Sequence, residues 1–279
     1  MHENPYEPPR SSLLPESNGQ RIGGSLESGL AGQYHFTIPG VLEEAWQRVS
    51  GAKLPILLAV LLLVGVSLAG QILESILGHI LPTSTLALLS VVISLGINFI
   101  TAPMSAGLAM LGVRRAVDAP LDAASVLNYF DRMLPLFLVA LATGVIILAC
   151  FGIGAGVVAA TKSPLGALIC LPGIYFAITL QLAPLLVVEM GLTPMEALRA
   201  SRQALSRQFW RVFGLFFVLW LVLTLFIMIT VGVGVVWAIP MGVIAQGILY
   251  REVFGVEVGA TIPAPARTPD SPGDGQMMA

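Results

Sequence analysis

Long stretches without a charged side chain decide what this chain can fold into. Residues 54–73 contain no Lys, Arg, Asp or Glu, and the longer stretch 75–113 contains none either. An α-helix rises about 1.5 Å per residue, so about 20 apolar residues span the roughly 30 Å hydrocarbon core of a bilayer. A water-soluble core instead scatters its apolar residues at helical or strand spacing among polar ones. Lipid is therefore the expected solvent of these segments.

The composition agrees with a membrane protein and argues against several function classes. Hydrophobic residues make up 56% of the chain and charged residues 11%, compared with roughly 25% charged in ordinary soluble domains. The net charge of −2 and the lack of a Lys/Arg run argue against nucleic-acid binding. The sequence has no His-x-x-x-His, Cys-x-x-Cys or Gly-x-x-x-x-Gly-Lys motif. We therefore expect no metal, no cofactor and no enzymatic activity.

We expect an all-α polytopic membrane bundle over residues 37–255. The tails at 1–36 and 256–279 are rich in proline and lack hydrophobic periodicity, which is typical of disordered segments. The uncharged stretch 212–250 is short for two crossings, so one crossing followed by a re-entrant segment is the alternative there. The six expected transmembrane helices are 54–73, 85–111, 133–159, 165–188, 212–231 and 233–250.

Positive charges give the expected orientation. With six crossings both termini share one side of the membrane, and every Lys and Arg except Lys162 lies on that side. The positive-inside rule makes that side the cytoplasm. We therefore expect a multi-pass protein of a bacterial inner membrane with cytoplasmic N and C termini. Six interfacial arginines next to helix ends are expected to reach anionic lipid: Arg114, Arg115, Arg199, Arg202, Arg207 and Arg211.

The pattern predicts three repeats of a cytoplasmic amphipathic helix followed by a transmembrane hairpin. Amphipathic stretches at 41–49, 121–131 and 193–209 precede the three helix pairs. The last of these opens with Thr193, Pro194 and Glu196, which is a capping-box pattern. The second helix of each pair contains a proline in a similar tripeptide. We expect these prolines to kink their helices, for packing rather than for gating: Pro103, Pro184 and Pro240.

Few polar side chains lie inside the expected crossings. Neutral residues such as Asn98, Gln181 and Gln246 are explained by hydrogen bonds between helices. A solute path lined by these three residues is the alternative interpretation. An ion-coupled pump is disfavoured, because it would normally need a carboxylate in the membrane interior.

Two further pairs of residues are expected to have structural roles. Glu189 lies near the inner end of the fourth expected helix, where we expect it to pair with Arg199. Cys150 and Cys170 lie inside apolar runs, where a thiol behaves as a small hydrophobic group. We expect free thiols, and a disulfide between them is the alternative, because both lie at similar depth.

Several loose motifs carry a resemblance to known proteins. They are the segment 182–187 around Pro184, the segment 191–201, the closing stretch from Ile239 to Phe254, and the opening residues 4–9. On these motifs the chain resembles a broad group of uncharacterised bacterial six-helix membrane proteins, akin to the membrane domain of some glycerophosphodiester phosphodiesterases. The resemblance implies the six-helix membrane domain. It does not imply the phosphodiesterase, because no such domain accompanies this chain.

These observations together favour a non-enzymatic role in the membrane. We expect a protein that organises lipids or partner proteins through its basic amphipathic helices. Its expected partners are membrane lipids, other membrane proteins or further copies of itself. The alternative is a transporter or channel for a small neutral or lipidic substrate.

Overall fold

The computed structural model describes residues 21–162 and 168–257, and almost all of this part of the chain is helical. Five helical stretches are long and apolar enough to cross a membrane, so the protein is an all-α multi-pass membrane protein. Many of their large apolar side chains are exposed, as helices surrounded by lipid require. The five stretches are Lys53–Ile80, Ser84–Ala116, Ala123–Thr161, Leu168–Met190 and Phe209–Ile229.

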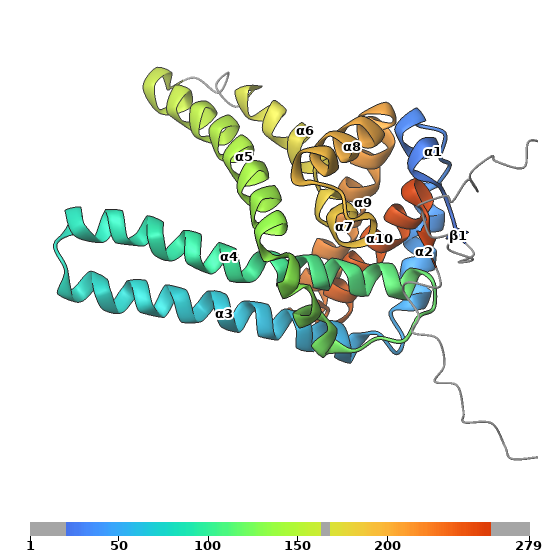
Figure 1. Cartoon of the computed structure of the whole chain (residues 1–279), viewed down its shortest axis with the longest axis horizontal. Helices are drawn as coiled ribbons and strands as arrows, with labels where there is room; N and C mark the ends of the chain where they lie inside the picture. Colours follow the sequence, from blue (N-terminus) through green and yellow to red (C-terminus); the bar gives the residue numbers. More distant parts are fainter. Residues whose placement is uncertain (1–20, 163–167, 258–279) are drawn as a thin grey trace, which may run out of the picture.

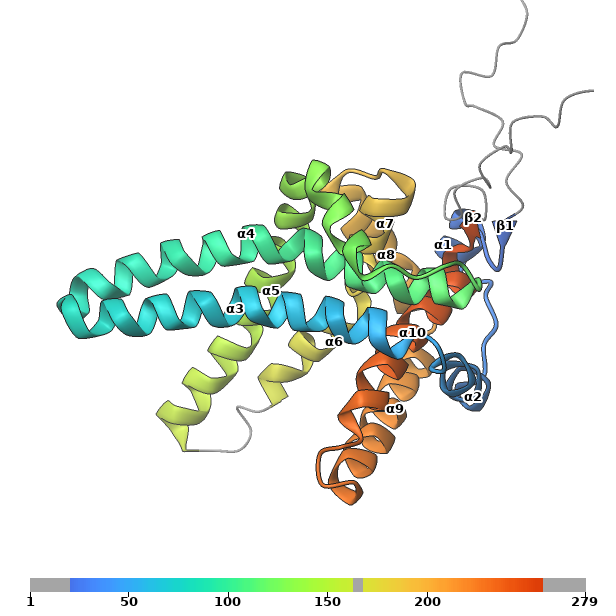
Figure 2. The ribbon, with the colours of Figure 1, turned by 90° about the horizontal axis from the view of Figure 1, so that it is seen from below.

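Three helical hairpins diverge from a common base (Figure 1). The first hairpin lies along the long axis of the molecule in Figure 1, and the third points away from it when the molecule is seen from below (Figure 2). The hairpins consist of α3 (Lys53–Ile80) and α4 (Thr83–Ala116), of α5 (Met133–Thr161) and α6 (Leu171–Thr179), and of α9 (Phe209–Ile229) and α10 (Val235–Phe254).

We call the common base the hub. It contains the short helices together with the last turns of α4 and α10, and most of the buried apolar residues of the described chain lie in it. Two short strands also close on each other here, with Arg21 opposite Glu257 in an antiparallel pair. The hub elements are β1 (Arg21–Ile22), α1 (Leu26–Ala31), α2 (Ile38–Arg48), the 3-10 helix η1 (Ala123–Arg132), α7 (Ala183–Met190), α8 (Pro194–Arg207) and β2 (Val256–Glu257).

The amphipathic helices begin where the sequence places helix-capping residues. The Thr37 hydroxyl accepts a hydrogen bond from the Gly40 N–H at 3.2 Å and so caps α2. The carboxylate of Glu196 accepts from the Thr193 N–H at 3.1 Å, which forms the predicted capping interaction at the start of α8. The apolar face of α8 is buried against the hub, with Ala204 and Leu205 fully covered. Its arginines therefore lie on the opposite face.

Residues 21–36 differ from the expected disordered tail. Ser25 and Ser28 cap α1 reciprocally, and Tyr34 is only 2% exposed. The apolar residues Leu26, Leu30 and Tyr34 follow each other at intervals of one helical turn, a pattern that the prolines and glycines around it obscure. Residues 1–20 and 258–279 of the expected tails lie outside the described part of the chain.

The expected fourth helix, 165–188, consists of two pieces. Residues 163–167 lie outside the described residues, α6 ends at Thr179, and the chain turns through Leu180–Leu182 before α7 begins. Pro184 lies in the first turn of α7, where a missing N–H costs no hydrogen bond, so the proline divides the helix rather than kinking it. The Ser201 hydroxyl donates to the Thr179 carbonyl at 2.7 Å and so satisfies one acceptor that the break leaves free. By contrast, α4 and α10 continue through Pro103 and Pro240.

The first hairpin is longer than the expected helices 54–73 and 85–111. α3 has 28 residues and α4 has 34, so they are about 42 Å and about 51 Å long. Both exceed the hydrocarbon thickness of roughly 30 Å, so the hairpin must tilt or extend beyond the hydrocarbon core. Only Leu81 and Pro82 connect the end of α3 to the start of α4.

The last expected crossing, 233–250, corresponds to α10. A turn at 230–234 separates α9 from α10, with Val231 and Gly232 in the left-handed region at φ 52° and φ 89°. α10 is not among the five candidate spans, because Gln246, Arg251 and Glu252 lie in its second half. Eleven of its 20 residues are nevertheless buried within the protein. A Cβ at Gly247 would collide with the Gly112 backbone, so α10 crosses α4 with the two backbones in contact.

Candidate functional site at the hub

An ion-pair network joins the ends of three helices at the hub. The Arg251 guanidinium at the end of α10 donates to both carboxylate oxygens of Glu44 in α2, at 2.7 and 2.9 Å. It also donates to the carbonyl of Ala116, the last residue of α4, at 2.7 Å. In addition, it forms an ion pair with Glu252 at 2.7 Å. The Arg251 side chain is only 12% exposed, so these bonds lie largely out of water. The arrangement fixes α2, α4 and α10 to one another.

A second set of bonds extends this network to the start of α3. Arg48 pairs with Glu44 at 2.9 Å and with Asp118 at 2.7 Å, and Arg115 donates to the carbonyls of Arg48 and Ser50. Burial alone would raise the pKa of Glu44, but the ion pairs with Arg251 and Arg48 outweigh it and hold the pKa below its usual value of 4.5. Glu44 is therefore ionised at neutral pH and forms ion pairs with both Arg48 and Arg251.

The six expected interfacial arginines divide into two groups. Arg114 and Arg115 are half-buried in the hub, where Arg115 makes the bonds just described and Arg114 lies beside Tyr129. The other four are exposed on α8 and the first turn of α9, and none of them forms an ion pair with another described residue. They are Arg199, Arg202, Arg207 and Arg211. Arg115 thus links elements of the hub and Arg114 is half-buried beside Tyr129, whereas the exposed four leave their charges available.

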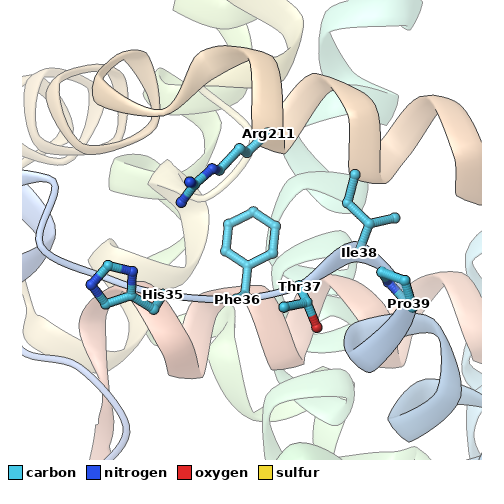
Figure 3. Close-up of a pocket in the computed structure, with 6 residues that line it drawn as sticks. All are labelled: His35, Phe36, Thr37, Ile38, Pro39 and Arg211. Carbon is cyan, nitrogen blue, oxygen red and sulfur yellow. The ribbon is translucent and has the colours of Figure 1, made fainter.

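A groove at the hub surface contains one of these four arginines (Figure 3). It has a volume of about 710 Å³ and is lined by residues 35–39, which are the end of the α1–α2 linker and the start of α2, and by Arg211 of α9. Figure 3 shows the Arg211 side chain reaching over Phe36 toward the side of His35. A second groove of about 470 Å³, lined by residues 206–211, adjoins the first through Arg211. Trp210 at this second groove is 79% exposed.

Hydrogen bonds hold the linker of this groove against α8. The Tyr34 hydroxyl donates to the Ala204 carbonyl at 3.1 Å, and the Gln208 side-chain amide donates to the carbonyls of Gly32 and Tyr34 at 2.8 and 2.7 Å. Burial raises the pKa of Tyr34 to about 12, although the nearby Arg211 cation lowers it. Tyr34 is therefore a neutral donor at every physiological pH. The groove wall thus includes His35 and Phe36, the last two residues of the tail that was expected to be disordered.

The expected polar path is only partly assembled. The Gln246 side chain donates to the Gln181 carbonyl at 3.3 Å, and the Gln181 side-chain nitrogen is buried without a hydrogen-bond partner. Asn98 lies elsewhere, on the projecting part of α4. Gly112 of α4 contacts Gly247, next to Gln246, so Asn98 is about 21 Å away from this contact along the helix axis. The structure brings two of the three residues together and leaves the third apart.

Neither of the two other pairs considered from the sequence, Glu189 with Arg199 and Cys150 with Cys170, is bonded in the structure. Glu189 does not pair with Arg199, which is exposed; instead it accepts the Glu257 N–H at 3.4 Å and lies beside the buried Tyr250 hydroxyl. Cys150 and Cys170 are free and half-buried. No cluster of His, Cys, Asp and Glu that could hold a metal occurs in residues 21–162 and 168–257.

Sequence reasoning missed the residues that carry the hub network. Glu44 and Arg48 are one helical turn apart, which is a recognisable ion-pair signal, but their partners Asp118 and Arg251 lie 70 and 207 residues from them. Nothing local in the sequence connects such distant positions.

Comparisons with known proteins do not assign the chain to a family. No family model matches it, and neither the curated proteins nor the solved structures include a match. What the fold and the site establish is a multi-pass helical membrane protein with five apolar helices of membrane-span length and a polar, cross-linked hub.

Proposed function

We propose that this protein binds anionic lipid headgroups at the cytoplasmic face of a bacterial inner membrane, and that it does so without catalysing a reaction. One observation carries the proposal. Four exposed arginines on α8 and α9 are free of ion pairs within the described chain, and two of them, Arg207 and Arg211, line a groove together with the exposed Trp210. Exposed Trp at a membrane interface and Arg reaching anionic headgroups are the usual features of such a surface.

The course of the hairpins supports six crossings, with the three amphipathic helices on the hub side. Each hairpin leaves the hub and returns to it, as shown by the bonds of Arg115 to Ser50, of Arg132 to Val187 and of Arg251 to Glu44. If α9 crosses the membrane, α10 must cross back for Arg251 to reach the hub. An even number of crossings then places both ends of the chain on the hub side. The arginines there make it the cytoplasmic side by the positive-inside rule.

Electrostatics favours anionic lipid over neutral lipid at this face. A Lys or Arg near an anionic membrane surface contributes about 1 kcal/mol, and the contribution falls with distance over a Debye length. Because the four arginines are already exposed and unpaired, binding breaks no ion pair within the described residues. The grooves beside Arg211 offer space for a headgroup, and the exposed rings and aliphatic side chains beside them suit the start of an acyl chain.

The proposal is tested by lipid retention of the full chain. We would purify it from nanodiscs that contain phosphatidylglycerol and phosphatidylcholine and count retained lipids by native mass spectrometry. Replacing Arg199, Arg202, Arg207 and Arg211 together by Gln should reduce retained phosphatidylglycerol at least tenfold, since four contributions of about 1 kcal/mol exceed the 1.4 kcal/mol of a tenfold change.

The control variant keeps the four positive charges and replaces each guanidinium by an ammonium group. The corresponding fourfold Arg→Lys variant should retain most of the phosphatidylglycerol, because the surface attraction is mainly a matter of charge. Both variants should unfold at the temperature of the unmodified protein, since none of the four side chains forms an ion pair with another residue in the part of the chain that the structure describes. Equal retention of phosphatidylglycerol by the unmodified protein and the Gln variant would overturn the proposal.

The structure favours this function over a solute path through Asn98, Gln181 and Gln246. Asn98 is about 21 Å along α4 from Gly112, which contacts Gly247 next to Gln246, so the three residues do not line one short passage. We expect that replacing all three by Leu leaves solute flux in liposomes at the level of the unmodified protein. A specific flux that this triple variant abolishes would restore the transport hypothesis.

A further inference from the structure

A stripe of polar side chains runs along the lipid-exposed part of α4. Its members recur at intervals of three or four residues, so they share one face of the helix. The stripe is about 22 Å long by the helical rise, which is most of the hydrocarbon thickness. It consists of Ser90, Ser94, Asn98, Thr101 and Ser105.

The neighbouring helix faces this stripe with further polar groups. The Ser94 hydroxyl donates to a carboxylate oxygen of Glu74 in α3 at 3.2 Å. A groove of about 210 Å³ between the two helices is lined by these residues, by Asn98 and Thr101 of α4, and by Ser67, Gln71 and Ile97. Glu74 is the only ionisable residue that lines it. No Lys or Arg occurs between Lys53 and Arg114, so this hairpin supplies no Lys or Arg side chain to Glu74.

A second groove continues from the first on the other side of α4. It has a volume of about 380 Å³ and shares Ser94 and Asn98 with the first groove. Its opposite wall belongs to α5, which diverges from α4 in Figure 1, and is apolar: Ala140, Leu141, Gly144, Val145 and Leu148. The rings of Phe99 and Phe137, 5.2 Å apart, join the two helices on the hub side of this groove.

These grooves differ from ordinary lipid-facing surface. The Asn98 side-chain amide has no hydrogen-bond partner among the described residues, and Glu74 accepts only the one bond from Ser94. An amide without a hydrogen-bond partner and a carboxylate without a cation both have a high free energy in contact with hydrocarbon. Glu74 lies about 32 Å along α3 from Lys53, so with the hub at one interface it lies at headgroup depth in the opposite leaflet. A polar, positively charged group at that depth would satisfy it.

We infer that the grooves on α4 bind a phospholipid with a primary ammonium headgroup from the leaflet opposite the hub. The ammonium donates to the Glu74 carboxylate, and the Asn98 amide and Ser94 hydroxyl bond the polar region next to it. An acyl chain lies against the apolar α5 wall. An ethanolamine phospholipid has this chemistry. A phosphatidylglycerol headgroup does not, because it brings a negative charge to a carboxylate.

Competition between lipids tests the inference on the full chain in nanodiscs. A photoactivatable phosphatidylethanolamine should crosslink to α3, α4 or α5, and unlabelled phosphatidylethanolamine should compete at least tenfold better than phosphatidylcholine of the same chains. Glu74→Gln should abolish that preference. Free ethanolamine at equal concentration should not compete, because it lacks the chain that fits the α5 wall. Competition by free ethanolamine, or equal competition by phosphatidylcholine, would overturn the inference.

Two variants show whether the preference belongs to Glu74 rather than to charge elsewhere on the protein. Glu43→Gln replaces an exposed carboxylate on α2 and should leave the preference for phosphatidylethanolamine unchanged. The fourfold Arg→Gln variant of α8 and α9 should also leave it unchanged, so the failure of the proposed function would not affect this result. A crosslink between two copies of the chain through Asn98→Cys, in place of the lipid crosslink, would show that a second copy occupies the stripe and would overturn the inference.

Discussion

Arg251 and Glu44 form a two-point ion pair across 207 residues of sequence, and the same guanidinium donates to the last carbonyl of α4. A bidentate arginine–carboxylate pair is among the stronger polar interactions in proteins. Here it closes the ring of contacts that holds the amphipathic helix α2 against α4 and α10.

Removing one partner of this pair should destabilise the protein. Hydrogen bonds to charged groups contribute about 1.5–3 kcal/mol, so Glu44→Gln should lower the free energy of unfolding by about 2 kcal/mol. Unfolding of the purified protein in detergent, followed by circular dichroism, measures the change. Glu43→Gln is the matched control, because Glu43 is exposed and bonds only Gln47. An equal loss in both variants would contradict the role of the pair.

The same pair predicts a dependence of stability on acid. The pKa of Glu44 is lower in the folded protein than its usual value of 4.5, so ionised Glu44 stabilises the fold. This contribution is complete above about pH 4.5 and is lost as the pH falls through the folded-state pKa. The melting temperature should therefore drop on acidification below about pH 4.5, and drop less in Glu44→Gln. A variant with the same acid dependence as the unmodified protein would show that other carboxylates dominate.

The crossing of α10 over α4 should tolerate no side chain at Gly247. A methyl group there collides with the Gly112 backbone, so Gly247→Ala must separate the helices and should cost about 3 kcal/mol or more. Gly242→Ala, on the same helix with open space around its Cβ position, should be neutral or slightly stabilising. Unfolding in detergent distinguishes the two, and similar stability of both variants would exclude close backbone contact.

The hydroxyl of Tyr34 should matter for the order of residues 26–36. Tyr34→Phe removes the bond to Ala204 and leaves that carbonyl without this donor, at a cost of about 1 kcal/mol. Hydrogen exchange of α1 and of the linker to α2 should accelerate severalfold, while exchange in α9 should not change. Unchanged exchange in α1 would show that apolar packing alone fixes this segment.

The apolar part of this fold follows from the sequence and the polar part does not. Runs such as 54–73 predict membrane-spanning helices because lipid imposes one length and one composition on them. The same rule does not distinguish α10, whose second half carries Gln246 and Arg251 and is buried by protein rather than by lipid.

The ends of helices and the roles of the arginines were harder to predict. Pro184 predicts a disturbance, but the sequence does not show that the helix divides or that Ser201 of another helix bonds the freed Thr179 carbonyl. Arg115 and Arg211 look alike in the sequence, since both lie next to the end of an expected transmembrane helix. Only the fold shows that Arg115 is bonded to the start of α3 while Arg211 lines a groove.

The pairing of β1 with β2 also determines when folding of the chain can be completed during its synthesis. Arg21 precedes all three hairpins in the chain, whereas its partner Glu257 follows the last of them. β1 therefore has no pairing partner until the last hairpin has been synthesised. A truncated nascent chain that lacks β2 will hold its apolar helices in the bilayer and yet leave its opening strand unpaired.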